Sequence, residues 1–263
     1  MAYRVVDALY PEWCIWNDFL NGDMSGALAR DSIRITHPIE SSIHSPSEIE
    51  EIFDDISYGK GASILRMLDA YIGDGVFKKG VARYLKQFSF ANAAGSDLWD
   101  SMDNSSGTSV KKIMSKWIRK PGYPVIIASL QGDNLVLMQR RFLLTGEIEN
   151  DIWPIPITMD LNGSLRTLLL DSKEKSIEAQ DLTTLKVNVN HTGFYRVYYD
   201  GLYDRVWGSE LSNLDRWGIL SDAFAFLIAG MMSFTDYLLM LNKYLEEEDY
   251  LPALEASDQL SFL

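Results

Sequence analysis

The segment Pro121-Gly122-Tyr123-Pro124 constrains the fold of this chain more than any other. On its N-terminal side apolar residues recur at helical spacing, and on its C-terminal side they form short runs separated by turn residues. A proline cannot continue the interior of a helix, and it biases the residue before it toward an extended conformation. The last helix must therefore end here. We expect an α+β protein of several domains, with helices in residues 1–121, strands in 122–203 and helices again in 204–263.

Helices are predicted before this segment by apolar residues spaced three or four positions apart. A first stripe is interrupted by Pro11, and a second follows Ser47 and Glu50, which form a capping box. The stripes comprise Val5, Val6 and Leu9; Ile49, Ile52, Phe53 and Ile56; Ile64, Leu65 and Leu68; Phe77, Val81, Tyr84, Leu85 and Phe88; and Val110, Ile113, Met114, Trp117 and Ile118. Asp74 is expected to cap the fourth stripe, and residues 30–46 are expected to be extended.

Short strands are predicted after the proline segment. Gly132-Asp133 and Asn162-Gly163 are turn signals between strand-like runs, and the second is the stronger because both of its residues tolerate the positive φ that a tight hairpin requires. His191-Thr192-Gly193 predicts a third hairpin turn. Pro154 and Pro156 cannot donate to a neighbouring strand, so their strand is expected at a sheet edge. The six runs, which together predict an antiparallel β-sandwich, are 123–130, 134–144, 152–161, 165–171, 185–190 and 194–200.

Helical spacing returns near residue 204. Ser212, Asn213 or Asp215 is expected to cap a helix that carries an apolar stripe of Trp217, Leu220, Phe224 and Leu227. A second helix is predicted from Asp236 to Leu245, and the acidic residues 246–249 are expected to form a solvated face. Because the chain ends on apolar residues without a stop signal, we expect it to be cut within an element.

Composition narrows the possible partners and environment. The net charge of -13 argues against binding to nucleic acid, whose phosphates would repel it. The single cysteine, Cys14, excludes a disulfide within the chain, and its neighbours Trp13, Ile15 and Trp16 predict that it is buried. We expect no signal peptide, because charged residues interrupt the apolar residues of 1–20, and the longest uncharged apolar run, 223–232, is too short to cross a membrane. A cytoplasmic location is expected.

Most catalytic motifs are missing from the sequence, including His-Glu-x-x-His, a P-loop and Gly-x-Ser-x-Gly. His37 with Glu40, or His44 with Glu48, could in principle bind a metal, but surface or strand-end histidines are the favoured interpretation. His191 is expected to be exposed in its turn. The acidic residues near one helix start, which complement the helix dipole there, are Glu50, Glu51, Asp54 and Asp55.

Tyr58 lies in the stretch Ile56-Ser57-Tyr58-Gly59-Lys60-Gly61, between two apolar stripes. From composition alone, packing at a helix junction is the favoured interpretation, because aromatic side chains in apolar surroundings usually pack. The flanking Gly59 and Gly61 suit a tight backbone that aims the ring into a cleft. Lys60 is expected to be solvated.

The stretch EIFDDISYGKGASILRML resembles the tyrosine segment of the M1 family of zinc aminopeptidases, of the aminopeptidase N and puromycin-sensitive type. The resemblance extends in order along nearly the whole chain, and the archaeal aminopeptidases that work downstream of the tricorn protease are the most similar members. The other segments that carry it are RDSIRITHPIE, KWIRKPGYPVI, QRRFLL, WPIPIT, VNVNHTGFYRVYYD, LDRWGILSDAFAFLIAG and EEEDYLPALEA.

The resemblance implies a division of the chain into the helical end of a thermolysin-like catalytic domain (1–121), a small β-sandwich (122–203) and the first helices of a C-terminal helical domain (204–263). In the family, zinc is held by His-Glu-x-x-His and a later Glu, the motif Glu is the general base, and a tyrosine donates a hydrogen bond to the oxyanion. Only the tyrosine maps onto this chain, at Tyr58. The resemblance therefore implies an internal fragment that is inactive alone and binds no catalytic zinc.

Two hypotheses remain open for the function. The first is that the parent protein is a zinc aminopeptidase acting on peptide N-termini, with the missing N-terminal part, a second copy or the tricorn protease as partners. The second is a non-catalytic scaffold or protein-interaction module, in which Tyr58 only packs. An exposed phenolic oxygen at a cleft would favour the first, whereas a ring sealed in the core would favour the second.

Overall fold

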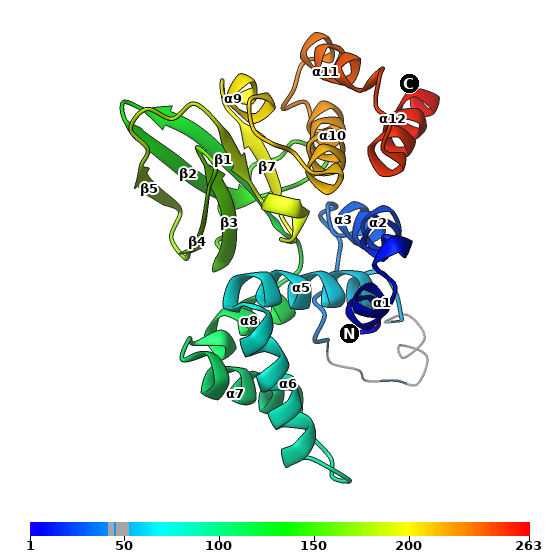
Figure 1. Cartoon of the computed structure of the whole chain (residues 1–263), viewed down its shortest axis with the longest axis vertical. Coiled ribbons are helices and arrows are strands. Elements are labelled where there is room, and N and C mark those ends of the chain that lie inside the picture. The colour runs from blue at the N-terminus through cyan, green and yellow to red at the C-terminus, as the bar shows by residue number, and fades with distance from the viewer. Residues whose placement is uncertain (42–44, 46–52) are drawn as a thin grey trace.

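The computed structural model describes residues 1–41, 45 and 53–263, in which two groups of helices accompany two β-sheets (Figure 1). The predicted capping box of Ser47 and Glu50, and Ile49 and Ile52 of its stripe, lie outside the described residues. In the described part of 30–46, the chain from 31 to 41 forms turns and bends without a helix or strand. The mixed α and β content predicted from the sequence is confirmed.

Helices make up most of the described part of residues 1–121, and the apolar stripes predict several of them. The helices predicted by the stripes of α5, α6 and α8 are confirmed. Asp74 was expected to cap α6, but it is the first residue of that helix and Gly73 is the cap. Helix α7 was not predicted, because polar residues dominate its sequence. The helices are α1 (Ala2–Leu9), α2 (Ile15–Phe19), α3 (Ser25–Arg30), α5 (Gly61–Ile72), α6 (Asp74–Gln87), α7 (Gly95–Ser106) and α8 (Val110–Arg119).

Two sheets follow the proline segment. The order is β5-β2-β1-β7 in one and β4-β3-β6 in the other. The hairpins at Gly132-Asp133 and Asn162-Gly163 are confirmed, and Asn162 and Gly163 have φ angles of 53° and 77°, as their turn requires. The strands are β1 (Pro124–Gln131), β2 (Asn134–Arg141), β3 (Ile155–Leu161), β4 (Ser164–Leu170), β5 (Glu174–Glu178), β6 (Leu185–Val187) and β7 (Arg196–Tyr199).

The strand connections differ from the prediction in three respects. The polar strand β5 was missed, because an exposed edge strand lacks an apolar face. Strands β6 and β7 belong to different sheets and β7 runs parallel to β1, so the turn at His191-Thr192-Gly193 is not a hairpin. Strand β3 is central rather than at an edge. Pro156 is accommodated because β6 pairs only with Met159 to Leu161, beyond the proline.

Helices return after β7. Ser212 is confirmed as the cap of α10, where its hydroxyl accepts a hydrogen bond of 3.1 Å from the backbone N–H of Asp215. The predicted helix from Asp236 is shorter, and Tyr244 closes a 3₁₀ turn after it. The acidic stretch 246–249 is not only a solvated face, because Glu247 and Asp249 pair with Arg216. These helices are α9 (Tyr203–Trp207), α10 (Asn213–Ile228), α11 (Phe234–Leu241) and α12 (Tyr250–Phe262).

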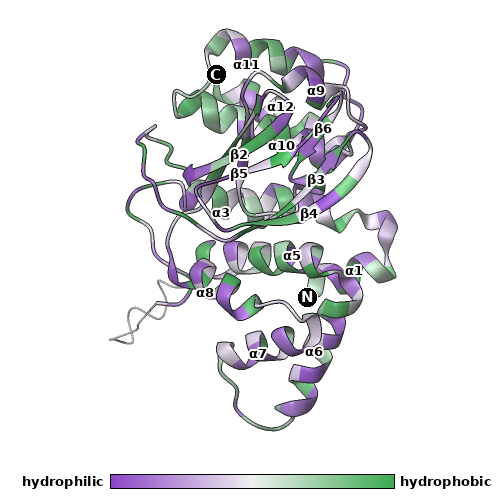
Figure 2. Ribbon diagram, turned by 90° about the vertical axis from the view of Figure 1, so that its left-hand side faces the viewer, coloured by the Kyte–Doolittle hydropathy of each residue, from purple (hydrophilic) through white to green (hydrophobic). Residues whose placement is uncertain are grey.

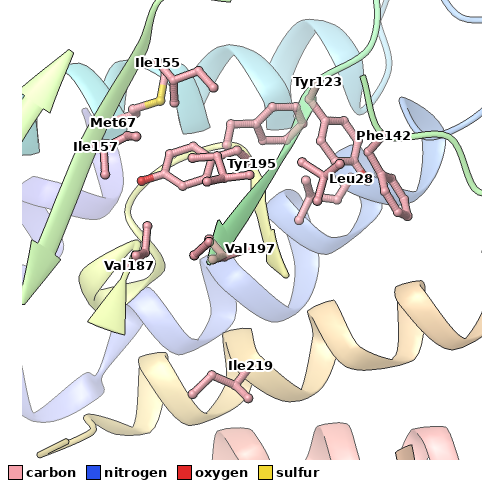
Figure 3. Close-up of a cluster of buried hydrophobic side chains, with 14 of the residues drawn as sticks. Leu28, Met67, Tyr123, Phe142, Ile155, Ile157, Val187, Tyr195, Val197 and Ile219 are labelled. Carbon is pink, nitrogen blue, oxygen red and sulfur yellow. The ribbon is translucent and has the colours of Figure 1, made fainter. Parts of the chain in front are cut away.

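One hydrophobic core joins the helices to both sheets. Its buried side chains include Leu28 of α3, Met67 of α5, Ile157 of β3, Val197 of β7 and Ile219 of α10 (Figure 3). In Figure 2, α5 runs directly beneath the sheets, with α6 and α7 farther from them. The residues before and after the proline segment therefore share one core, and α5 is the helix that lies next to the sheets.

Cys14 is exposed, so its predicted burial is wrong. It adopts a left-handed conformation with φ of 47° between the short turn Pro11–Trp13 and α2, and this kink directs the neighbouring Trp13 outward. Among the described residues, no helix is both long and apolar enough to cross a membrane.

Candidate active site

Tyr58 occupies a single π-helical turn, Ile56–Lys60, that continues directly into α5. Its side chain is 60% exposed and lies 5.9 Å, between ring centroids, from Phe53. The ring borders a cavity of about 420 Å³ between α1, α2 and α5 to α7. The aromatic residues that line the rest of this cavity are Tyr3, Trp16, Phe19, Phe77 and Trp99. The phenol is therefore open to a cavity rather than sealed in the core.

The backbone around Tyr58 is held by close packing. A Cβ atom added to Gly59 would lie 2.3 Å from the carbonyl oxygen of Asp23 and 3.0 Å from the Cβ of Ala27, so only glycine fits here. Ser63 donates a hydrogen bond of 2.7 Å to the carbonyl oxygen of Gly59. Gly61 differs, because a Cβ atom there would meet nothing within 4 Å. The two glycines that flank Lys60 therefore have different structural roles.

Lys60 is fully buried, so the expectation that it is solvated is wrong. Its Nζ lies 2.8 Å from Oδ2 of Asp31 and donates hydrogen bonds of 3.1 Å and 3.0 Å to the carbonyl oxygens of Lys120 and Gly122. Burial lowers the pKa of Lys60, and the Asp31 carboxylate counteracts part of that shift. A charge that is otherwise costly to bury is thus satisfied by three oxygens.

Asp54 holds the start of the π-helical turn. Its Oδ1 accepts hydrogen bonds of 3.0 Å and 3.1 Å from the backbone N–H groups of Ile56 and Ser57. Its Oδ2 pairs with Arg30 and with His37, at 2.9 Å in each case. Burial raises the pKa of Asp54, but its hydrogen bonds with His37 and the backbone outweigh that effect, so the pKa is lowered.

His37 has acceptors at both ring nitrogens, because Nδ1 lies 2.9 Å from the carbonyl oxygen of Pro38 and Nε2 lies 2.9 Å from Asp54. Partial burial lowers the pKa of His37, yet these two interactions prevail and the pKa is raised. Glu40 pairs with Arg119 at 2.6 Å rather than with His37. The alternative that His37 and Glu40 bind a metal is therefore unsupported, and the pair of His44 and Glu48 lies outside the described residues.

Comparison with known proteins places the sequence in a family. The profile of the Peptidase family M1 domain matches residues 1–117, and that of the ERAP1-like C-terminal domain matches residues 184–263. Leucyl aminopeptidase of Saccharolobus solfataricus is 47% identical over 261 residues, which are 99% of this chain and 33% of that protein. The chain belongs to the M1 peptidase family.

Two further M1 relatives agree over the whole chain. Probable aminopeptidase 2 of Sulfurisphaera tokodaii is 45% identical over 100% of this chain and 34% of its own length. Tricorn protease-interacting factor F2 of Thermoplasma acidophilum is 44% identical over 100% of this chain and 33% of its own length. The chain thus spans about one third of the length of the curated relatives it matches.

The described residues of this M1 chain do not fit a catalytic zinc. Across 1–41, 45 and 53–263, no three His, Cys, Asp or Glu side chains gather as a metal-binding group. Zinc in M1 enzymes requires several such ligands in one place.

His191 was expected to be exposed, and this is wrong, because it is fully buried after β6. The ring lies against α10, where a Cβ atom added to Gly218 would come within 2.2 Å of its Nδ1 and where Trp217 makes an edge contact at 5.1 Å. Its Nε2 has no hydrogen-bond partner. Burial lowers the pKa of His191 well below its ordinary value, and the positive charges of Lys186 and other cations lower it further.

Proposed function

We propose that this chain supplies the oxyanion-stabilising tyrosine of an M1 aminopeptidase, an enzyme that removes N-terminal residues from peptides. The observation that carries the proposal is the exposure of Tyr58 at a cavity, on a turn whose next two residues are buried. Membership in the M1 family supports the reaction class. The exposed phenol also favours this function over a scaffold in which the ring would only pack.

The chemistry of peptide hydrolysis accounts for a tyrosine at this position. When water attacks a peptide carbonyl group, negative charge develops on the carbonyl oxygen. A preorganised O–H donor stabilises that charge more in the transition state than in the substrate, and this difference is what accelerates the reaction. The packing of Gly59 against Asp23 and the burial of Lys60 hold the donor in place before the substrate arrives.

The proposed assignment of functions to the parts of the enzyme rests on the zinc ligands that the described residues lack. We assign zinc binding, the general base and recognition of the substrate amine to the remaining two thirds of an enzyme with the length of the relatives. Residues 1–121, 122–203 and 204–263 are then the helical end of a catalytic domain, a small β-sandwich and the start of a C-terminal helical domain. By itself the chain is proposed to be inactive and to bind no catalytic zinc.

The proposed partners are peptides, the rest of the enzyme and, in a cytoplasmic setting, the tricorn protease. Support for the last comes only from the names of two relatives, the tricorn protease-interacting factors F2 of Thermoplasma acidophilum and Thermoplasma volcanium. Support for docking of further protein comes from α1, which has no fully buried residue and leaves Val5 and Leu9 more than half exposed.

Activity measurements on the full-length polypeptide that contains this chain test the proposal. The change of Tyr58→Phe removes only the O–H donor and is expected to lower kcat by about 10²–10³-fold, with little change in KM for an aminoacyl amide. A matched control is Tyr84→Phe, because Tyr84 lies on α6 outside the cavity lining. Equal kcat for the wild type and Tyr58→Phe would remove Tyr58 from the mechanism and leave the scaffold as the better account.

A further inference from the structure

We propose that Lys60 and Asp31 form a positioning device for Tyr58. This ion pair joins the π-helical turn Ile56–Lys60 to the segment between α8 and β1. The inference rests on the proposed function of Tyr58. Lys60 and Asp31 touch no substrate in this account. They act through the orientation of the phenol.

The device begins with the geometry of the turn. Each residue of an α-helix rotates the chain by about 100°, and the rotation in a wider π-helical turn is somewhat smaller, so in both cases side chains two positions apart project to nearly opposite sides. Tyr58 is 60% exposed at the cavity, whereas Lys60 is fully buried on the other side. Holding Lys60 therefore fixes the backbone of the turn and with it the direction of the Cα–Cβ bond of Tyr58.

The partners of Lys60 come from two distant parts of the chain. Asp31 ends α3, and its Oδ2 lies 2.8 Å from Nζ of Lys60. The carbonyl oxygens of Lys120 and Gly122, which accept hydrogen bonds from Nζ, lie between α8 and β1. An ammonium group has three N–H donors, and each has an oxygen within reach. The side chain is thus held from three directions.

Asp31 also binds the segment between α8 and β1 through its other carboxylate oxygen. Its Oδ1 accepts hydrogen bonds of 2.8 Å from the backbone N–H of Gly122 and 2.9 Å from the hydroxyl of Thr36. Gly122 has a φ angle of 80°, and a Cβ atom there would lie 2.4 Å from Nε of Arg141, so glycine is required. Gly122 therefore binds both members of the ion pair, through its carbonyl group and its N–H group.

The choice of a buried ion pair indicates a need for orientation more than for stability. Replacing a buried pair with apolar side chains is often neutral or stabilising, because burying charges has a large desolvation cost. A pair of fixed geometry does, however, restrict the angle and depth of each partner. At two residues from Tyr58, that restriction places the phenol with an accuracy that apolar packing alone does not supply.

A double variant tests the device without leaving an isolated buried charge. The variant Lys60→Met with Asp31→Asn keeps an acceptor for Gly122 and removes both charges. The control is Lys111→Met with Asp100→Asn, an exposed pair at 2.7 Å on α8 and α7. In the full-length enzyme the first variant is expected to lower kcat at least about tenfold with KM changed less than about twofold, whereas the control leaves both unchanged.

A cycle with Tyr58→Phe separates positioning from general destabilisation. If the pair acts only through the phenol, the double variant lowers kcat less than about twofold in the Tyr58→Phe background. An equal loss in both backgrounds would overturn the inference while leaving the role of Tyr58 intact. If Tyr58→Phe alone leaves kcat unchanged, the proposed function fails instead.

A spectroscopic measurement on the 263-residue chain is independent of activity. Replacing Tyr58 by 3-fluorotyrosine gives a ¹⁹F signal that reports the surroundings of the ring. We expect one narrow resonance in the wild type and in the control, and a shifted or broadened resonance when Lys60 and Asp31 are changed. An identical resonance in all three proteins would overturn the inference.

Discussion

The guanidinium group of Arg66 donates a hydrogen bond of 2.6 Å to the carbonyl oxygen of His191, across a sequence separation of 125 residues. A second hydrogen bond of 3.0 Å joins Arg66 to the carbonyl oxygen of Asn190. Arg66 lies on α5, eight residues after Tyr58, and the backbone N–H of Asn190 is in turn held by Asp215 at the start of α10. The helix that follows the candidate catalytic turn is therefore joined to the sheets and to the C-terminal helices through one side chain.

Removal of this connection is expected to destabilise the whole chain. The change Arg66→Met keeps the apolar stem over Trp16, whose ring lies 4.9 Å from the guanidinium carbon, but it loses both hydrogen bonds. Because hydrogen bonds to charged groups contribute about 1.5–3 kcal/mol each, we expect a loss of about 2–4 kcal/mol in the free energy of unfolding. Urea denaturation measures it. Arg83→Met, at an exposed position on α6, is the control and should change stability by less than about 0.5 kcal/mol.

The buried His191 predicts a stability that falls in acid. The pKa of His191 is lower in the folded state than in the unfolded chain. At acidic pH the unfolded chain therefore binds a proton that the folded state does not bind. Stability from this group is complete above the unfolded value of about 6.5 and is lost as the pH falls below it, by at most about 1.4 kcal/mol per pH unit. We expect His191→Phe to remove that slope. The free energy of unfolding is measured for both proteins between pH 5 and 8. If it changed with pH equally in the wild type and in His191→Phe, the expectation would be contradicted.

The two glycines around Lys60 provide a matched pair of substitutions. Gly59→Ala is expected to destabilise the chain by about 1–3 kcal/mol, because the new methyl group would meet the backbone oxygen of Asp23 at 2.3 Å. Gly61→Ala is expected to be neutral or to stabilise the chain by up to about 1 kcal/mol, because it begins α5 and has open space around it. Thermal unfolding distinguishes the two, and a similar loss for both would show that the packing argument is wrong.

The exposed face of α1 predicts self-association of the isolated chain. Val5 and Leu9 lie four positions apart on α1 and are 53% and 65% exposed. Met1 before the helix and Trp13 in the following 3₁₀ turn are 59% and 60% exposed. An apolar surface of this kind favours association. Light scattering should show a mass that rises with concentration, and Val5→Glu with Leu9→Glu should suppress the rise. A constant monomer mass in the wild type at high concentration would count against this prediction.

Local features of the fold were accessible from the sequence because neighbouring residues decide them. The positive φ angles of Asn162 and Gly163 belong to the turn itself, and the cap of α10 by Ser212 involves a residue three positions away. The apolar stripes of α5 and α8 follow from helical periodicity in the same way. Tyr58 was proposed as a site residue from its segment, whose residues are consecutive in the chain.

Only the tertiary structure decided which polar side chains are buried and which strands pair. Lys60 and His191 read as surface residues, because the Asp31 carboxylate, the Gly122 carbonyl group and the face of α10 that enclose them lie 27 or more positions away in the sequence. Strand β7 pairs with β1 across about seventy residues instead of with its neighbour β6. Periodicity reports the face that a residue occupies, but burial of a charge depends on partners that the folded chain alone brings together.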